Sequence, residues 1–226
     1  MQNKKWAVLL IGTALLAATA CAPTQNEHKE GSVSVNGAAG QANPEAAADP
    51  LKEKYRDSVF LGDSITEGLS FHDVLDEKNV LAGAGKTAEF AMMENDVGQL
   101  ASRKPERVFI QLGSDDILWP TDDPQQYSLK HYAQLIDRIR AELPEASVTL
   151  LSVAPVTEEA RQKEPRYARI EDYNEGLRQL AEQKNAGYFD LAPLVNEHAE
   201  LYDSDGIHFQ KAFYPILLHD LDRRSK

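Results

Sequence analysis

The fold is decided by the stretch Phe60-Leu61-Gly62-Asp63-Ser64-Ile65-Thr66-Glu67-Gly68. An apolar run stops there at a glycine, an acid and a hydroxyl, and helix-starting residues follow. Such a strand end places Ser64 at the carboxyl edge of a sheet, where the unpaired N–H groups of the next helix favour developing negative charge. The stretch therefore predicts a nucleophile turn. Ser64 with Glu67 three residues later also fits a capping box, so a helix cap without chemistry is the alternative.

Outward from this turn, short apolar runs alternate with segments of helical period. The runs predict strands at 58–61, 79–82, 107–112, 147–153 and 187–191. Apolar spacing predicts one helix through 90–100 and others around 132–143, 170–180 and 211–222. This alternation is typical of β-α-β units and predicts a three-layer α/β/α domain with a parallel sheet over residues 51–226.

In sheets of this kind the ligand site lies beyond the carboxyl ends of the strands. We therefore expect the site among the loops that begin at Gly62, Gly83, Gly113, Ala154 and Ala192. The charged loop 154–166 is a candidate lid, with a solvated connection as the alternative. His72, His131, His198 and His219 are interpreted as surface or packing residues.

Residues 1–21 have the pattern of a secretory signal. Lys4 and Lys5 precede an apolar run too short to span a membrane comfortably, and small residues follow up to Cys21. This pattern resembles the lipobox of bacterial lipoproteins, in which the cysteine is lipidated, although Ala18 stands where leucine is usual. The expected location is extracytoplasmic, anchored to the cell membrane by lipid on Cys21. An ordinary signal peptide or an uncleaved anchor is the alternative.

Residues 22–50 contain almost no large apolar side chain and predict a disordered tether. Cys21 is the single cysteine of the chain, so no intramolecular disulfide is expected after it. The formal net charge is −12 and no basic stripe is present. These features argue against a nucleic-acid partner, which requires clustered Lys and Arg.

A second chemical signal is Asp205-Gly206-Ile207-His208 near the carboxyl terminus. An acid three residues before a histidine is able to hold the imidazole Nδ1–H while Nε2 faces outward as a general base. A simple Asp-Gly turn is the alternative. Together with Ser64, however, the two residues complete the nucleophile, base and orienting acid that acyl transfer through serine needs.

The segment Gly83-Ala84-Gly85-Lys86-Thr87-Ala88 imitates two nucleotide motifs. A phosphate-binding loop would need a glycine at position 80, where Val80 stands, and a dinucleotide site usually follows the first strand of the sheet. Neither condition holds, so the segment does not predict a nucleotide cofactor.

The folded part of the chain resembles the SGNH, or GDSL, hydrolase family. Gly62-Asp63-Ser64 resembles its first block, Gly83 and Gly85 lie in its second, 113–116 resembles its third, Gly-x-Asn-Asp, and Asp205-x-x-His208 its fifth. The resemblance implies a flavodoxin-like, five-stranded parallel sheet in the order 2-1-3-4-5. It implies ester hydrolysis or acyl transfer without a metal or organic cofactor, with Ser64, His208 and Asp205 catalytic. The N–H groups of Ser64 and Gly85 would hold the oxyanion.

Asp115 departs from the family pattern, which has asparagine at this position. Asparagine donates an N–H to the oxyanion, whereas an ionised carboxylate has no proton to give and repels the charge. Three accounts stay open: Asp115 is protonated in a desolvated site beside Asp116, another donor replaces it, or catalysis is weak.

The leading hypothesis is a membrane-tethered serine esterase that acts on small-molecule or envelope-carbohydrate acyl esters. Asp115 motivates the alternative of a non-catalytic ligand-binding protein on the same fold. A metal-dependent phosphohydrolase using Asp63, Asp115 and Asp116 is a third hypothesis, which leaves the Asp-x-x-His pattern unexplained.

Overall fold

A five-stranded parallel sheet lies at the centre of the computed structural model, which describes residues 49–224. The strand order is β2-β1-β3-β4-β5, and every neighbouring pair is parallel. The strands are β1 (Ser58–Gly62), β2 (Val80–Ala82), β3 (Arg107–Gln111), β4 (Ser147–Leu151) and β5 (Gly187–Phe189). The order confirms the sheet implied by the family resemblance.

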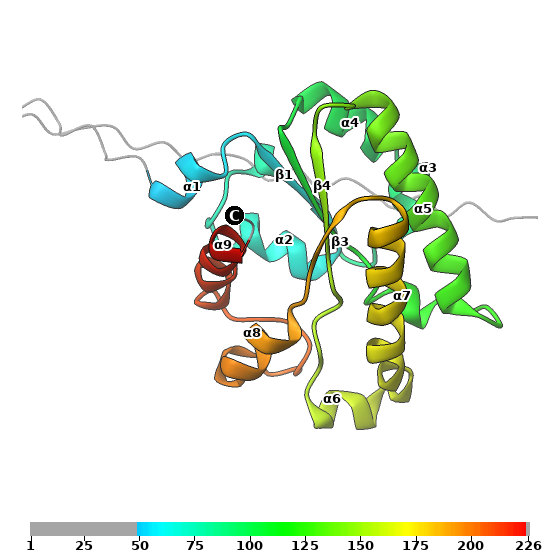
Figure 1. The fold of residues 1–226 in the computed structure, drawn as a ribbon. Coiled ribbons are helices and arrows are strands. Elements are labelled where there is room, and N and C mark those ends of the chain that lie inside the picture. The colour runs from blue at the N-terminus through cyan, green and yellow to red at the C-terminus, as the bar shows by residue number, and fades with distance from the viewer. Residues whose placement is uncertain (1–48, 225–226) are drawn as a thin grey trace, which may run out of the picture. The chain divides into compact units, whose positions relative to one another are not determined.

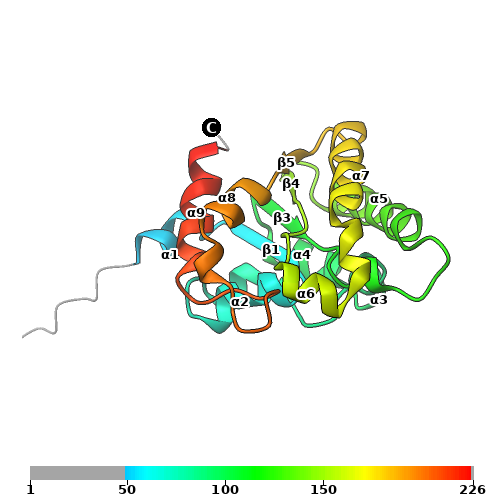
Figure 2. The same cartoon turned by 90° about the horizontal axis from the view of Figure 1, so that it is seen from below.

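Helices cover both faces of this sheet (Figures 1 and 2). One buried apolar cluster joins the sheet to α3 (Ala88–Met93), α4 (Asp96–Arg103), α5 (Pro124–Glu142) and α7 (Ile170–Gln183). A second cluster joins the opposite face to α1 (Pro50–Lys54), α2 (Ser64–Phe71), α8 (Ala192–Glu197) and α9 (Phe213–Arg224). The strands are apolar on both faces because both are covered. The predicted three-layer α/β/α class is confirmed.

Shorter helical elements lie in the connections. They are η1 (Glu77–Asn79), η2 (Asp116–Leu118), α6 (Glu158–Lys163), η3 (Pro165–Arg169) and η4 (Ala199–Leu201). The loop 154–166 therefore contains a helix, α6, which the sequence analysis did not predict.

The single helix predicted through 90–100 is wrong. The chain forms two helices there, α3 and α4, and Asn95 between them has a φ of 61°. Asparagine tolerates this left-handed conformation better than most side chains, so the helix breaks at Asn95 and the chain turns. Helical apolar spacing continues across the break, which is why the pattern did not reveal it.

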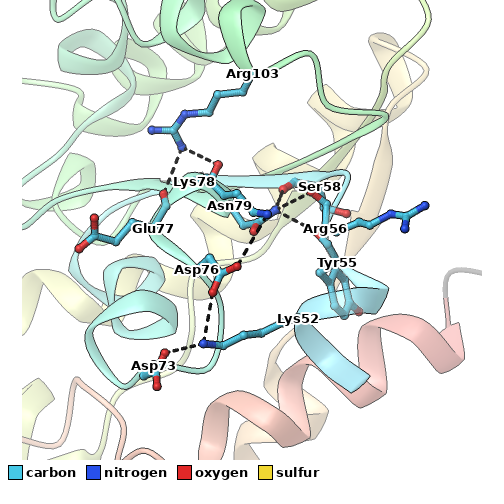
Figure 3. A network of polar contacts seen from close by, with 10 residues as sticks. All are labelled: Lys52, Tyr55, Arg56, Ser58, Asp73, Asp76, Glu77, Lys78, Asn79 and Arg103. Carbon is cyan, nitrogen blue, oxygen red and sulfur yellow. Dashed lines mark hydrogen bonds and ion pairs between the residues drawn. The ribbon is translucent and has the colours of Figure 1, made fainter. Parts of the chain in front are cut away.

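The amino end of β1 is fixed by a polar network (Figure 3). The side-chain amide of Asn79 donates to the carbonyl oxygens of Tyr55, Arg56 and Ser58 at 2.9, 3.0 and 2.7 Å. Arg103 donates to the carbonyl of Val80 at 3.0 Å, on the neighbouring strand. These bonds hold β1 and β2 in register, which in turn fixes where β1 ends and the turn to Ser64 begins.

The first residues described belong to α1, which begins at Pro50 with the Asp49 side chain accepting the N–H of Leu51 at 2.9 Å. The predicted signal sequence, Cys21 and nearly all of the predicted tether lie outside the described residues.

Among the helices between residues 49 and 224, none combines the length and the apolar character that a membrane span requires.

Candidate active site

The turn between β1 and α2 places the serine hydroxyl. At Gly62 a Cβ atom would lie 2.0 Å from Oγ1 of Thr66 and 2.5 Å from the carbonyl oxygen of Gln111, so only glycine allows this tight strand-to-helix passage. Asp63 is the N-cap of α2, and its Oδ1 accepts the N–H of Ile65 at 3.0 Å. The interpretation of Ser64 as the helix cap is therefore wrong. Because Asp63 performs the capping, the Ser64 hydroxyl is available for other contacts.

Ser64 and His208 are 144 residues apart in the sequence and meet at the carboxyl edge of the sheet. Oγ of Ser64 lies 2.9 Å from Nε2 of His208, and Nδ1 of His208 lies 2.5 Å from Oδ2 of Asp205. The side chains of His208 and Asp205 are 41% and 45% exposed. The three predicted residues thus form one chain of two hydrogen bonds that is open to solvent at one end.

Asp205 is held as a carboxylate by the backbone that follows it. Its Oδ1 accepts the N–H groups of Ile207 and His208, both at 2.9 Å, while Oδ2 faces the imidazole. Partial burial works against ionisation, but these hydrogen bonds outweigh it and lower the pKa of Asp205. An ionised Asp205 keeps the proton of the neutral imidazole on Nδ1, which leaves Nε2 as the acceptor facing Ser64.

The loop that carries His208 is bonded to the segment after β4. Thr157 donates its N–H to the carbonyl of Gly206 at 2.9 Å, and the Tyr202 hydroxyl donates to the carbonyl of Pro155 at 2.6 Å. Residues 154–166, which the sequence predicts as a lid, thus support the loop 202–209 that carries His208, called the histidine loop below. Movement of the segment as a lid stays a prediction.

The two backbone N–H groups that the sequence assigns to the oxyanion have no hydrogen-bond partner within residues 49–224. One is that of Ser64, the first residue of α2, and the other is that of Gly85. Gly85 has a φ of 76° in a turn that is closed by the Lys86 N–H and the Gly83 carbonyl. Lys86 also fixes this loop through an ion pair of 2.6 Å with the buried Asp96. Their predicted role at an oxyanion needs such unpaired donors.

Behind the serine, Asp63 is 1% exposed and accepts a hydrogen bond from the Ser114 hydroxyl. Burial raises the pKa of Asp63 to about 7, although the Ser114 bond acts in the opposite direction and the nearby Asp115 adds to the rise. The N-cap of α2 is therefore a carboxyl group with a pKa near neutral pH.

Asp116 is also buried, and its Oδ1 accepts the Ser128 hydroxyl at 2.6 Å and the Ala88 N–H at 3.2 Å. Its Oδ2 is buried without a partner in the described part of the chain, and burial raises its pKa to about 6. Burial likewise raises the pKa of Asp115, with His208 acting in the opposite direction. The account in which Asp115 is protonated requires a shift of its pKa in this direction.

The carboxyl groups do not converge as metal ligands. Within residues 49–224 no three His, Cys, Asp or Glu side chains are placed to hold an ion together. Asp63 and Asp116 instead accept hydrogen bonds from neighbouring hydroxyl and N–H groups. The donor set of the phosphohydrolase hypothesis is thus absent from this part of the chain.

A cavity of about 250 Å³ adjoins the serine. Its lining comes from α2, from the histidine loop and from α9, and consists of Ser64, Glu67, Gly68, Phe71, His72, Asp203, His208, Phe209 and Tyr214. Sequence reasoning assigned no site role to Glu67, Phe71, His72, Asp203 or Tyr214. The helical spacing of 64, 67, 68 and 71 would have shown that these positions share one face of α2.

A sequence profile of the GDSL-like Lipase/Acylhydrolase family matches residues 60–216 of this chain. No curated protein matches the sequence. Among solved structures, a GDSL-like lipase from Bacteroides thetaiotaomicron is similar with a TM-score of 0.60, 20% identity, and coverage of 76% of this chain and 88% of that chain.

Two further structures have the same fold. The lipase/acylhydrolase from Enterococcus faecalis has a TM-score of 0.57 at 18% identity, with coverage of 74% of this chain and 95% of its own. An acetyl xylan esterase has a TM-score of 0.58 at 18% identity, with coverage of 74% and 98%. At these identities the structural likeness concerns the fold, whereas the profile match establishes the family.

Proposed function

This chain belongs to the GDSL-like lipase/acylhydrolase family and is an esterase, and we propose that it cleaves acyl esters through Ser64, His208 and Asp205. One observation carries this proposal: the hydrogen bonds of 2.9 and 2.5 Å that link the serine hydroxyl to the imidazole and the imidazole to the carboxylate. These contacts fit a nucleophile, its base and the acid that orients the base.

In the first half of the reaction, Nε2 of His208 takes the proton of the Ser64 hydroxyl while Oγ attacks the acyl carbonyl carbon. The carbonyl π electrons move to the oxygen, which accepts hydrogen bonds from the N–H groups of Ser64 and Gly85. The C–O bond to the alcohol then breaks, and His208 returns its proton to the leaving oxygen. Asp205 stabilises the imidazolium throughout and remains ionised.

In the second half, water takes the place of the alcohol. His208 removes a proton from the water as its oxygen attacks the acyl-serine, and then returns that proton to Ser64 when the carboxylic acid leaves. Each proton that His208 accepts is given back within the same half-reaction, so no cofactor enters the balance.

We further propose that the enzyme is tethered outside the cytoplasm by lipid on Cys21. The basic, apolar and small-residue order of residues 1–21 supports this location. Acyl esters of envelope carbohydrates are the proposed substrates, because such a tether holds the domain near them. The fold shared with an acetyl xylan esterase is consistent with a small acyl group on a sugar.

A fluorophosphonate probe tests the serine mechanism on the full chain. The unchanged chain is expected to label covalently and to hydrolyse p-nitrophenyl acetate, and Ser64→Ala is expected to lose both. Ser70→Ala is the matched control, because Ser70 lies on the same helix outside the cavity lining. Labelling that survives Ser64→Ala would refute the role of Ser64.

The same label, applied to cell fractions, tests the tether. The tether predicts that Cys21→Ala moves the labelled protein out of the membrane fraction.

A further inference from the structure

The cavity beside Ser64 has a face built by one helix. Positions 64, 67, 68 and 71 follow one another along α2 at the spacing of a single helical face, and all of them line the cavity. Phe71 closes this row and is 80% exposed, an unusual position for a large apolar side chain. A ligand whose ester reaches Ser64 therefore passes along Glu67 toward an exposed aromatic ring.

Tyr214 forms a second wall of the cavity. Its side chain is 98% buried, and a Cβ atom at Gly68 would lie 1.9 Å from its Oη, so the hydroxyl rests directly on α2 at Gly68. Within residues 49–224 this hydroxyl has no hydrogen-bond partner, and its oxygen is accessible from the cavity that Tyr214 lines. The glycine thus makes room for an unpaired polar group in the cavity wall, one turn from the nucleophile.

The charges around this cavity are negative. Glu67 and Asp203 both line it, while no Lys or Arg does. Within the described chain neither carboxylate forms an ion pair, and Asp203 accepts a hydrogen bond from the N–H of Ser204. Aromatic rings complete the wall, with His72 lying 5.0 Å from Phe71 and 5.3 Å from Tyr214 between ring centroids. Two carboxylates without an ion pair in the described chain, aromatic faces and a hydroxyl group without a protein partner there are complementary to a cation that has N–H donors.

We propose that the alcohol part of the substrate carries a protonated amine, which binds in this cavity. The carboxylates of Glu67 and Asp203 balance its charge, and Oη of Tyr214 accepts one of its N–H groups. A quaternary ammonium has no N–H to offer and leaves the tyrosine unpaired, so the cavity selects a primary ammonium, as in the ester of an amino sugar. This inference rests on the proposed function, because it takes Ser64 as the attacking atom.

The test compares two matched esters on the full chain, 6-O-acetylglucosamine and 6-O-acetylglucose, by acetate release. The amine-bearing ester is expected to have roughly 10-fold higher kcat/KM, mainly through a lower KM. Glu67→Gln and Asp203→Asn are each expected to reduce this ratio several-fold, because the amine-bearing ester loses more than the neutral one. Glu182→Gln removes the same charge from the exposed face of α7, away from the cavity, and is expected to keep the ratio.

A second measurement tests binding alone and does not require the enzyme to cleave the sugar esters. Glucosamine is expected to inhibit p-nitrophenyl acetate hydrolysis at roughly 10-fold lower concentration than glucose, and Tyr214→Phe is expected to weaken this inhibition several-fold. Acetylcholine provides the quaternary arm and is expected to be a poorer substrate than 6-O-acetylglucosamine.

Equal kcat/KM for the two acetyl esters, or equal inhibition by glucosamine and glucose, would overturn the amine proposal. So would a Glu67→Gln variant with the same ratio of kcat/KM values as the unchanged chain. A preference for acetylcholine would overturn the primary amine. None of these results touches the serine mechanism, since the neutral ester or p-nitrophenyl acetate is still cleaved. Failure of the unchanged chain to label with fluorophosphonate would instead remove the proposed function.

Discussion

Asp205 contacts the histidine that faces Ser64, Asp63 precedes Ser64 in the chain, and the two carboxyl groups show opposite electrostatics. Asp205 is 45% exposed, accepts hydrogen bonds from the imidazole and from two backbone N–H groups, and has a lowered pKa. Asp63 is 1% exposed, with hydrogen bonds from Ile65 and Ser114, and burial raises its pKa to about 7. Aspartate is thus a stable anion at position 205 and an acid with a pKa near 7 at position 63.

The difference shows what decides the charge of a carboxyl group in this site. Asp205 accepts three hydrogen bonds, one of them from the imidazole, whereas Asp63 accepts two. Burial opposes ionisation at both groups, but the hydrogen bonds outweigh it at the partly exposed Asp205 and do not at the fully buried Asp63. Asp115 and Asp116 resemble Asp63 in this respect, because burial raises the pKa of both.

The largest expected effect on kcat comes from changing Asp205, the more exposed of the two carboxyl groups. Asp205→Asn keeps the size of the side chain but removes the charge that stabilises the imidazolium and selects its tautomer. We expect kcat on p-nitrophenyl acetate to fall by roughly 10³- to 10⁴-fold. Asp137→Asn on the surface of α5 is the control, and it should leave kcat unchanged. A fall of less than 10-fold with Asp205→Asn would mean that His208 does not depend on this carboxylate.

A smaller effect is expected at Asp115, the half-buried carboxyl group that the family pattern assigns to the oxyanion. The raised pKa means that Asp115 is protonated, and so able to donate, below that pKa and loses the proton above it. Asp115→Asn has a donor at every pH. The ratio of kcat for the variant to kcat for the unchanged chain should therefore rise with pH as Asp115 loses its proton, toward ~10².

Asp115→Ala, which has no donor at any pH, separates the loss of a charge from the gain of a donor. It should give a lower kcat than Asp115→Asn throughout. A ratio for Asp115→Asn that stays flat with pH would show that protonation of Asp115 does not limit the rate.

The smallest expected effect concerns stability at Asp63. Its folded pKa of about 7 lies above the unfolded value of about 4, so the native state binds the proton more tightly. The free energy of unfolding should therefore fall as the pH rises from about 5 to about 8, on the order of 2 kcal/mol from this group. Urea denaturation at several pH values measures it. Asp63→Asn should flatten the curve and leave the part due to Asp116, whereas an unchanged slope would contradict the burial argument.

Local patterns were sufficient for most of the fold. Apolar strands such as 107–112 and helices such as 170–180 were predictable because burial on one or both faces leaves a period in the sequence. The break at Asn95 was not, since the apolar period continues through it and a left-handed φ leaves no apolar signal. The family resemblance, rather than the period, supplied the strand order, because strand pairing is a long-range property.

In the site, residue types predicted the chemistry but not the environment. Gly62-Asp63-Ser64 and Asp205-x-x-His208 identified the groups that meet. The sequence misassigned the helix cap to Ser64, because Asp and Ser are both good caps and one residue of register separates them. The cavity residues Phe71 and Tyr214 carry no motif, since their role depends on an approach between α2 and α9 at Gly68.

The sequence by itself determined the α/β class, the Gly-Asp-Ser turn after the first strand, and the pairing of His208 with the acid three residues before it. Those features depend on contacts between near neighbours or on repeating burial. Only the tertiary structure decided that Ser64 and His208 lie within a hydrogen bond, that Asp63 is sealed from water while Asp205 is not, and that Tyr214 offers a hydroxyl beside the serine. These depend on which distant segments exclude solvent from a given atom, and that is a property of the packed chain.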